Sequence, residues 1–419
     1  MLDLNYIREN AAKVKEAAKN KNRKVDIDRI LSLDETRREV IKQSQKLREE
    51  RNELAKQRPP SKETIERGKA IKDELKTIEE KLTETEKELN TLMLYVPNVP
   101  LDEVPVGSDS TGNKELKKWG EIPTFDFEIK DHIELGTALD IFDLDRGSKV
   151  SGFRGYFLKN EGAILHIALM FYVLQKLVKK GYTPFIAPSI VKQFTLFGTG
   201  HFPWGSEQDV YSLNDEDMYL AGTAEVPITA YHSGETLNEK DLPKRYVGFS
   251  PCFRREAGAY GRDTRGLYRL HEFWKIEQVI LGPNNLDEAR KLHEELQTNS
   301  EEILQDLKLP YRQLLMCTGD MGEPQLKKYD TETWMPSRKD YGETMSNSIM
   351  GEFQARRLDI KYRDKNNKVQ YAYTFNNTAV ASPRILIAIF ENYQQKDGSI
   401  LVPEALQPLC GFKDIKKKN

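Results

Sequence analysis

The residues best suited to chemistry lie in one stretch, 249–277, which is rich in arginine and glycine. Its arginines surround three glycines; they are Arg254, Arg255, Arg262, Arg265 and Arg269, around Gly258, Gly261 and Gly266. A guanidinium fork matches phosphate oxygens, and glycine permits the tight turns that bring such forks together. Glu256 and Glu277 flank the loop at positions expected to be strands. The stretch therefore suits an oligophosphate, although an ordinary arginine-rich surface loop fits these residues equally well.

Such a loop needs strands to hold it, and the pattern of apolar residues predicts several. Strands are expected at residues 246–249, 275–281, 360–362 and 369–374, and helices at 169–180 and 383–393. The most apolar run, Gly162–Leu174, has 13 residues and contains His166. It is too short to cross a bilayer and is expected to be a buried helix, so no membrane association is predicted.

The first hundred residues carry a different pattern, which predicts helices. A short amphipathic helix is expected at residues 4–19 and a long one at about 26–56, where Arg58-Pro59-Pro60-Ser61 must break it. Ser61 can then cap a second long helix. Apolar residues recur with heptad-like spacing in both helices, at Leu33, Val40, Leu47 and Leu54, and at Ile71, Leu75, Ile78, Leu82, Leu89 and Leu92. This spacing predicts an antiparallel coiled-coil hairpin.

Charge is distributed unevenly over this hairpin. The whole chain of 419 residues has a net charge of −2, but residues 37–72 carry 12 Lys or Arg against 6 Asp or Glu. A local basic stretch can bind RNA. Charge alone favours a solvated helical face, and hairpin arms also serve dimerisation, so RNA binding is one of three interpretations.

The composition of the chain indicates its cellular compartment and its number of domains. The three cysteines are far apart with no metal-binding spacing, and the first residues have no apolar leader, so a cytoplasmic protein is expected. Residues 96–123 are rich in Pro and Gly and mark a boundary. Two domains are predicted, a helical arm at 1–105 and a mixed body at 106–419.

Several longer segments resemble one family in the right order. The sequence F-R-R-E at 253–256 resembles motif 2 of the class II aminoacyl-tRNA synthetases, and its continuation to Glu277 is similar to the bacterial-type seryl enzymes. Residues 181–203 resemble motif 1, with its proline at Pro188. Residues 375–394 resemble motif 3, with its arginine at Arg384. Residues 220–230 contain the Thr-Ala-Glu signature of serine binding. The resemblance covers the whole chain.

The resemblance implies a fold, a reaction and partners. The implied fold is α+β, with an N-terminal helical hairpin and an antiparallel β-sheet body flanked by helices. The implied enzyme is a serine–tRNA ligase that uses ATP to activate L-serine to seryl-adenylate, releases pyrophosphate, and transfers serine to the 3′ end of tRNA(Ser). Charging of tRNA(Sec) is left open. The implied partners are ATP with Mg2+, serine, tRNA(Ser) and a second copy, bound through motif 1 around Pro188.

The resemblance also implies site residues. The residues expected to carry catalysis are Arg254, Glu256 and Arg384. Those expected at serine are Thr223, Ala224, Glu225, Arg254, Glu277, Asn376 and Thr378. Those expected at ATP are Arg254, Arg255, Glu256, Leu270, Phe273, Glu343, Thr344, Met345, Ser346 and Arg384, with Glu343 and Ser346 at Mg2+. Those expected at tRNA are Arg38, Lys42, Lys46, Arg51 and Arg58.

Chemistry supports several of these roles. A fixed cation at Arg254 would stabilise the charge that develops as the serine carboxylate attacks phosphorus. Phe273 and Arg384 would sandwich the adenine ring. Glu277 would accept a hydrogen bond from the serine hydroxyl, and a pocket built for a hydroxyl rejects alanine because a buried carboxylate would lose its partner.

Some positions depart from the family pattern. Met345 stands where a serine is usual, Asn377 and Pro383 stand where glycines are usual, and Trp274 stands where an aspartate is common. These departures leave one alternative, a catalytically degenerate dimeric RNA-binding paralogue. A ligase that loads a carrier protein is a second alternative, but such proteins lack the long arm. Because the arginines and glutamates of the motifs are present, divergence with activity retained is favoured.

Overall fold

A computed structural model describes residues 1–56, 59, 61–204, 209–214, 217–257 and 265–417. The chain divides into two compact units, Met1–Val99 and Pro100–Asn419. The predicted boundary after residue 105 therefore lies slightly inside the second unit. The reason is local packing, since Leu101 N–H donates to the Leu326 carbonyl at 3.0 Å and Val104 packs with Met316 and Met321.

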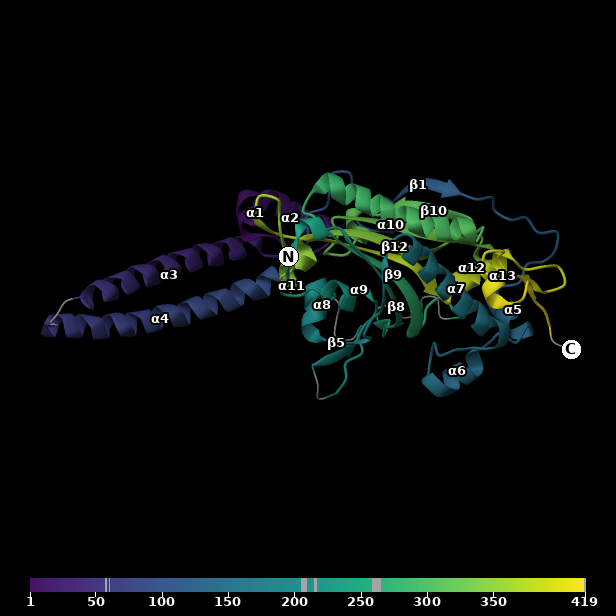
Figure 1. Cartoon of the computed structure of the whole chain (residues 1–419), viewed down its shortest axis with the longest axis horizontal. Helices are drawn as coiled ribbons and strands as arrows, with labels where there is room; N and C mark the ends of the chain where they lie inside the picture. The colour runs from purple at the N-terminus through teal and green to yellow at the C-terminus, as the bar shows by residue number, and fades with distance from the viewer. Residues whose placement is uncertain (57–58, 60, 205–208, 215–216, 258–264, 418–419) are drawn as a thin grey trace. The chain divides into compact units, whose positions relative to one another are not determined.

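The first unit is helical (Figure 1). It contains α1 (Leu4–Glu9), α2 (Ala11–Asn20), α3 (Ile27–Leu54) and α4 (Lys62–Met93). The helix predicted at 4–19 is divided at Asn10. Ser61 caps α4 as predicted, because its hydroxyl accepts a hydrogen bond from Thr64 N–H at 3.1 Å.

Helices α3 and α4 form the predicted antiparallel hairpin. Arg29, near the start of α3, makes two hydrogen bonds with Glu88 near the end of α4, at 2.7 and 2.8 Å. Nearer the turn, Arg67 bonds Glu50 at 2.6 and 2.9 Å. Apolar residues at the predicted spacing lie between the helices, among them the buried residues Leu33, Val40, Ile71, Leu75 and Leu89. The charged rim and the apolar seam together fix the register.

The second unit is built on an eight-stranded sheet with the order β1-β10-β11-β12-β15-β9-β8-β4. The strands are β1 (Lys114–Trp119), β10 (Tyr311–Leu315), β11 (Lys327–Met335), β12 (Asp340–Gly351), β15 (Tyr373–Ser382), β9 (Glu272–Gly282), β8 (Lys244–Phe253) and β4 (Thr183–Ile186). All neighbours are antiparallel except β4 and β8. The predicted fold class is confirmed.

Alternation along the strands sorts side chains onto two faces. On β9, Ile276 and Ile280 join the main core, which includes residues of α7 (Asn160–Lys179) and α10 (Leu286–Asp306). Val279 and Leu281 pack on the opposite face in a cluster with α9 (Glu225–Ala230) and α11 (Phe353–Leu358). Glu277 belongs to this second face by its spacing. Figure 1 shows α10 running across the sheet.

Helix α7 contains the apolar run Gly162–Leu174. Among the described residues it alone is long and apolar enough, by length and composition, to span a membrane. Leu165, Leu169 and Val173 are buried in the core, as the prediction of a buried helix requires. The opposite face is not buried, since Ile167 is 65% exposed and Phe171 48%.

Candidate active site

A cavity of about 290 Å³ lies in the second unit, and residues of β9, β12 and β15 line it. Most of the residues predicted at serine or ATP contribute to this lining. They are Thr223, Glu225, Arg254, Glu256, Leu270, Phe273, Glu277, Glu343, Thr344, Met345, Ser346, Asn376, Thr378 and Arg384. Two others are placed elsewhere: Ala224 is fully buried in the cluster beside β8, and the Arg255 guanidinium lies 5.9 Å from the ring centre of Tyr211.

One end of the cavity holds a buried ion pair. Lys275 Nζ lies 2.8 Å from Glu277 Oε2, which also accepts a hydrogen bond from the Thr378 hydroxyl at 3.2 Å. The register of the sheet explains the cluster. Lys275 and Glu277 are two residues apart on β9 and so share a face, and Thr378 on the neighbouring strand β15 pairs with Glu277. This end can therefore present a fixed carboxylate to a small polar ligand.

Glu225 is held beside this cluster by two amides. Gln354 Nε2 and Asn376 Nδ2 both donate to Glu225 Oε1, at 2.8 and 2.9 Å. The Thr223 hydroxyl accepts from Glu225 N–H at 3.2 Å and so fixes the start of α9. Burial raises the pKa of both Glu225 and Glu277 above the ordinary value, and the charge of Lys275 offsets this only in part.

The other end of the cavity is cationic and aromatic. The Arg254 guanidinium lies 5.2 Å from the ring centre of Phe273. Arg384, at the start of α12 (Arg384–Asn392), donates from Nε to the Tyr268 carbonyl at 3.1 Å and from a terminal nitrogen to the Glu343 carbonyl at 2.8 Å. Two arginines beside an aromatic ring suit a nucleotide, whose base can stack and whose phosphates need cations.

Glu256 lies next to this end with a left-handed backbone, at a φ of 55°. Its carboxylate bonds Arg269 at 2.6 Å. Arg269 thus holds Glu256 at the wall of the cavity, where an acceptor could meet an exocyclic amino group.

Hard oxygen donors gather on β11 and β12. Glu343 and Ser346 line the cavity. Asp330 accepts a hydrogen bond from Lys328 at 2.9 Å through one carboxylate oxygen, while its other, buried carboxylate oxygen has no hydrogen-bond partner. Desolvation raises the pKa of Glu343, but nearby cations, led by Arg384, outweigh it and keep the pKa below its ordinary value. An ionised carboxylate with a hydroxyl is a donor set that fits Mg2+.

The unusual residues of motif 3, and Trp274 in the continuation of motif 2, have local explanations. Asn377 points away from the cavity toward α10, where its amide donates to the Leu296 carbonyl at 2.6 Å and to the Ser300 hydroxyl at 2.9 Å. Pro383 immediately precedes α12, as expected for a residue that can begin a helix. Trp274 packs at a tilt against Phe249, at a centroid distance of 5.0 Å, on the face opposite Glu277. None of these side chains replaces the charged groups of the cavity.

Thr344 and Met345 have different structural roles. Thr344 is buried, and its hydroxyl bonds Thr333 at 2.7 Å and the Thr331 carbonyl at 3.2 Å. Met345 is 2% exposed and belongs to the main core while also reaching the cavity. Hydrogen bonds from the side chain of Thr344 are therefore committed to the sheet.

Sequence reasoning missed several residues of the site. Lys275 and Lys328 line the cavity, and Gln354 supports it from α11. Lys275 carried a usable signal, because period-two alternation places it on the same face as Glu277. Gln354 carried none, since its contact with Glu225 spans 129 residues of chain.

The residues predicted at tRNA lie on the hairpin of the first unit. Arg38, Lys42 and Lys46 are exposed and follow each other at intervals of four, so they share one stripe of α3. Arg38 also pairs with Asp34 at 3.2 Å. Arg51 is exposed on a different stripe, and Arg58 lies outside the described residues.

Fold and cavity together define a class II aminoacyl-tRNA synthetase. Residues 209–393 match the family described as tRNA synthetase class II core domain (G, H, P, S and T). Residues 1–100 match the Seryl-tRNA synthetase N-terminal domain.

Comparison with whole proteins narrows the class. A serine–tRNA ligase of Deinococcus radiodurans is 44% identical over 420 residues, covering 99% of each chain. One of Treponema denticola is also 44% identical, covering 99% of this chain and all of its own. The crystal structure of seryl-tRNA synthetase from Pyrococcus horikoshii complexed with ATP superposes with a TM-score of 0.94 at 36% identity, with both chains fully covered. This chain belongs to the seryl-tRNA synthetase family.

Proposed function

We propose that this protein activates L-serine with ATP and transfers it to the 3′ end of tRNA(Ser). The observation that carries the proposal is the pairing, in one cavity, of a buried carboxylate cluster around Glu277 with a cationic, aromatic end around Arg254 and Arg384. The relatives named as serine–tRNA ligases, and a family structure determined with ATP, support the same assignment.

Serine would bind at the carboxylate end. Glu225 would pair with the substrate ammonium, and Glu277 would accept a hydrogen bond from the substrate hydroxyl beside Thr378 and Asn376. Lys275 neutralises the negative charge of Glu277, so that two carboxylates can be buried in one pocket. Alanine and glycine cannot satisfy Glu277 and would be rejected.

ATP would bind at the cationic end. Phe273 and Arg384 would enclose the adenine ring, Glu256 and the backbone at Leu270 would contact its edge, and Arg254 would bridge the serine carboxylate and the α-phosphate. The carboxylate of serine is already a nucleophile, so activation requires positioning and charge stabilisation rather than a general base. Mg2+ held by Glu343 and Ser346 would neutralise phosphate charge.

The hairpin of the first unit would bind tRNA. Its exposed stripe of Arg38, Lys42 and Lys46 suits a phosphate backbone, because RNA helices are recognised mostly through shape and backbone. Arg51, on a different stripe of α3, and Arg58, outside the described residues, are proposed as further contacts with tRNA.

The active form would be a cytoplasmic homodimer. The apolar outer face of α7, with Ile167 and Phe171, borders a groove that is also lined by Phe249 and Trp274. Ile186 of β4, two residues before Pro188, is 89% exposed at the edge of the sheet. Exposed apolar residues of this extent are typical of an interface. A second copy would cover them through motif 1.

A charging assay with labelled serine, ATP, Mg2+ and transcribed tRNA(Ser) tests the proposal. We expect serine esterified to tRNA(Ser) only when ATP is present. Failure to charge, in a folded dimer that binds the tRNA, would favour the alternative of a degenerate RNA-binding paralogue. Neither the residues of the site nor the relatives support that alternative.

A further inference from the structure

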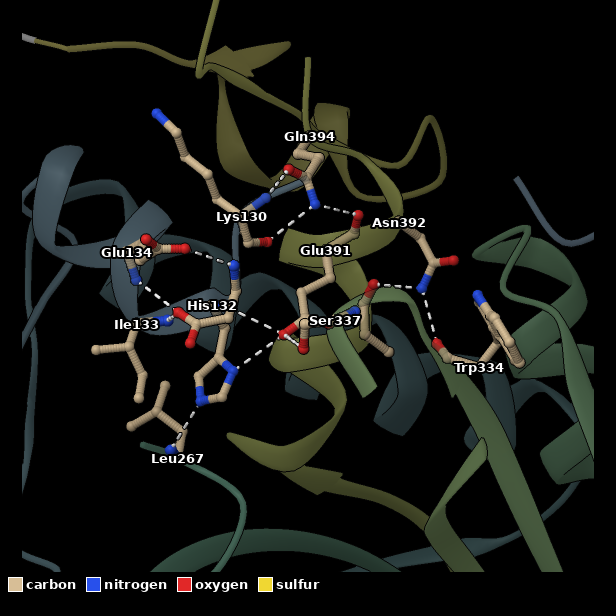
Figure 2. A network of polar contacts seen from close by, with 12 residues as sticks. Lys130, His132, Ile133, Glu134, Leu267, Trp334, Ser337, Glu391, Asn392 and Gln394 are labelled. Atoms are coloured by element: carbon tan, nitrogen blue, oxygen red, sulfur yellow. Dashed lines mark hydrogen bonds and ion pairs between the residues drawn. The ribbon is translucent and has the colours of Figure 1, made fainter. Parts of the chain in front are cut away.

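A histidine outside the cavity connects two parts of its wall. His132 is the first residue of α5 (His132–Ala138), and its side chain is 12% exposed. Figure 2 shows it between Glu391 of α12 and the backbone of Leu267. Leu267 lies in the turn that follows the motif 2 loop and lines the cavity with Tyr268, Arg269 and Leu270.

The partners of His132 define its tautomer. Leu267 N–H donates to His132 Nε2 at 3.2 Å, so Nε2 must be an acceptor without a proton. The proton therefore lies on Nδ1, which is 3.0 Å from Glu391 Oε1 and donates to it. A neutral imidazole in this tautomer satisfies both contacts, whereas a proton on Nε2 would face the amide N–H of Leu267.

Glu391 is fully buried and holds His132 firmly. Its carboxylate accepts from His132 N–H at 3.0 Å, and from the Ser337 amide and hydroxyl at 2.9 and 2.8 Å, besides the imidazole. A buried carboxylate with this number of donors is rigid, because any movement would leave a charge without hydrogen bonds.

Helix α12 also contacts the turn at 267–270 through a second residue, Arg384, which lines the cavity. Glu391 and Arg384 lie two turns apart on α12. Arg384 donates to the Tyr268 carbonyl, and its guanidinium lies 4.4 Å from the Tyr268 ring centre. Two sets of contacts thus join the turn after motif 2 to α12. In one, Tyr268 contacts Arg384 directly; in the other, His132 links Leu267 to Glu391.

Gly266, which precedes Leu267, lies directly against His132. Gly266 has a φ of +72°, which favours glycine, and a Cβ there would lie 2.1 Å from His132 Nε2. Any side chain at this position would therefore collide with the imidazole.

We infer that His132 is a positioning residue for ATP: it holds the backbone at 267–270 and, through Tyr268, the orientation of Arg384. The inference rests on the proposed function, since the turn matters only if ATP binds there. It assigns to His132 no contact with substrate.

Three variants test this inference by serine-dependent ATP–pyrophosphate exchange. His132→Asn keeps a donor near Glu391 but offers no acceptor to Leu267 N–H, and it should raise KM for ATP about tenfold while KM for serine changes little. His132→Gln can place an acceptor at the position of Nε2 and should restore most of the ATP affinity. Glu134→Ala removes the capping-box bond of the same helix without touching Leu267, and it is the matched control for the stability of α5.

The outcomes separate the inference from the proposed function. If the unaltered enzyme shows no exchange with serine, the proposed function fails. If it is active but His132→Asn leaves KM for ATP unchanged, or if Glu134→Ala raises it equally, then His132 supports only the helix and the inference is wrong. Thermal unfolding of each variant identifies loss of folded protein.

Discussion

Lys275 Nζ lies 2.8 Å from Glu277 Oε2, and the exposed fractions of the two side chains are only 6% and 2%. The pair lies at the end of the cavity where serine is proposed to bind. A second buried carboxylate, Glu225, acts on Glu277 through its charge. Lys275 is therefore the cation that allows two acidic side chains to share this pocket.

Replacing Lys275 with methionine should weaken serine binding and destabilise the fold. Loss of one partner leaves a buried charge, which costs about 3–5 kcal/mol in the free energy of unfolding. We expect KM for serine to rise by about tenfold or more, with KM for ATP changed far less. Exchange kinetics and chemical denaturation measure both effects.

A double variant gives the control for this prediction. Lys275→Met with Glu277→Gln removes both charges, so the free energy of unfolding should recover part of the loss while serine activation stays poor. Equal losses of stability in the single and double variants would contradict the assignment of Lys275 as the partner of Glu277.

The raised pKa values predict a pH dependence. Glu225 and Glu277 must be ionised to bind serine as proposed, and burial raises the pKa of each above the ordinary glutamate value of about 4.3. As pH falls through these raised values, kcat/KM for serine should decline before an exposed glutamate would titrate. Exchange measured against pH would contradict this if kcat/KM stayed level down to about pH 4.3.

Stability should respond with the opposite sign. A carboxylate whose pKa is higher in the folded than in the unfolded state binds more protons when folded. Its unfavourable contribution is present above the folded pKa and disappears as pH falls toward the unfolded value. The difference in unfolding free energy between the unaltered protein and Glu277→Gln, which cannot ionise at this position, should therefore shift in favour of the unaltered protein as pH is lowered.

Shortening the hairpin should separate the two half-reactions. Deleting residues 41–82 and joining the ends through two glycines removes Lys42, Lys46, Arg51 and Arg58. The buried residues Leu33, Leu89 and Met93 at the other end of the hairpin stay in place. We expect ATP–pyrophosphate exchange to persist and charging of tRNA(Ser) to be lost. Charging that survives the deletion would show that Lys42, Lys46, Arg51 and Arg58 are not needed to bind tRNA.

A charge on the outer face of α7 should prevent dimerisation. Ile167 is 65% exposed beside the apolar groove, and Ile167→Asp should convert a dimer to a monomer in sedimentation velocity. Val106, which is 70% exposed in the second unit but outside the groove lining, provides the matched control as Val106→Asp. Sedimentation of Ile167→Asp as a dimer would place the interface elsewhere.

Local rules were sufficient for much of the fold. Heptad spacing predicted the seam of Val40 and Leu75, and the cap at Ser61 followed from its residue type. The helix at 4–19 was predicted as continuous because its apolar pattern runs through Asn10, where the chain turns. Boundaries of this kind depend on packing within the unit rather than on periodicity.

The residues of the site also fall into those that the sequence predicted and those that it did not. The family resemblance implies that Glu277, Thr378 and Arg384 share one site, and all three line one cavity. The side chains that position them come from distant segments, as Gln354 and His132 do, and no local pattern marks such contacts. Asn377 stands where the family usually has glycine, a change that alters the allowed backbone near the serine pocket. The structure turns it toward α10, where it bonds Ser300.

The most direct test of the central claim is ATP–pyrophosphate exchange without tRNA, run in parallel with serine, threonine, alanine and glycine. The pocket around Glu277 and Glu225 predicts exchange with serine and little or none with the other three. No exchange with serine, in a folded dimer, or equal exchange with alanine, would contradict the assignment of this cavity to serine activation.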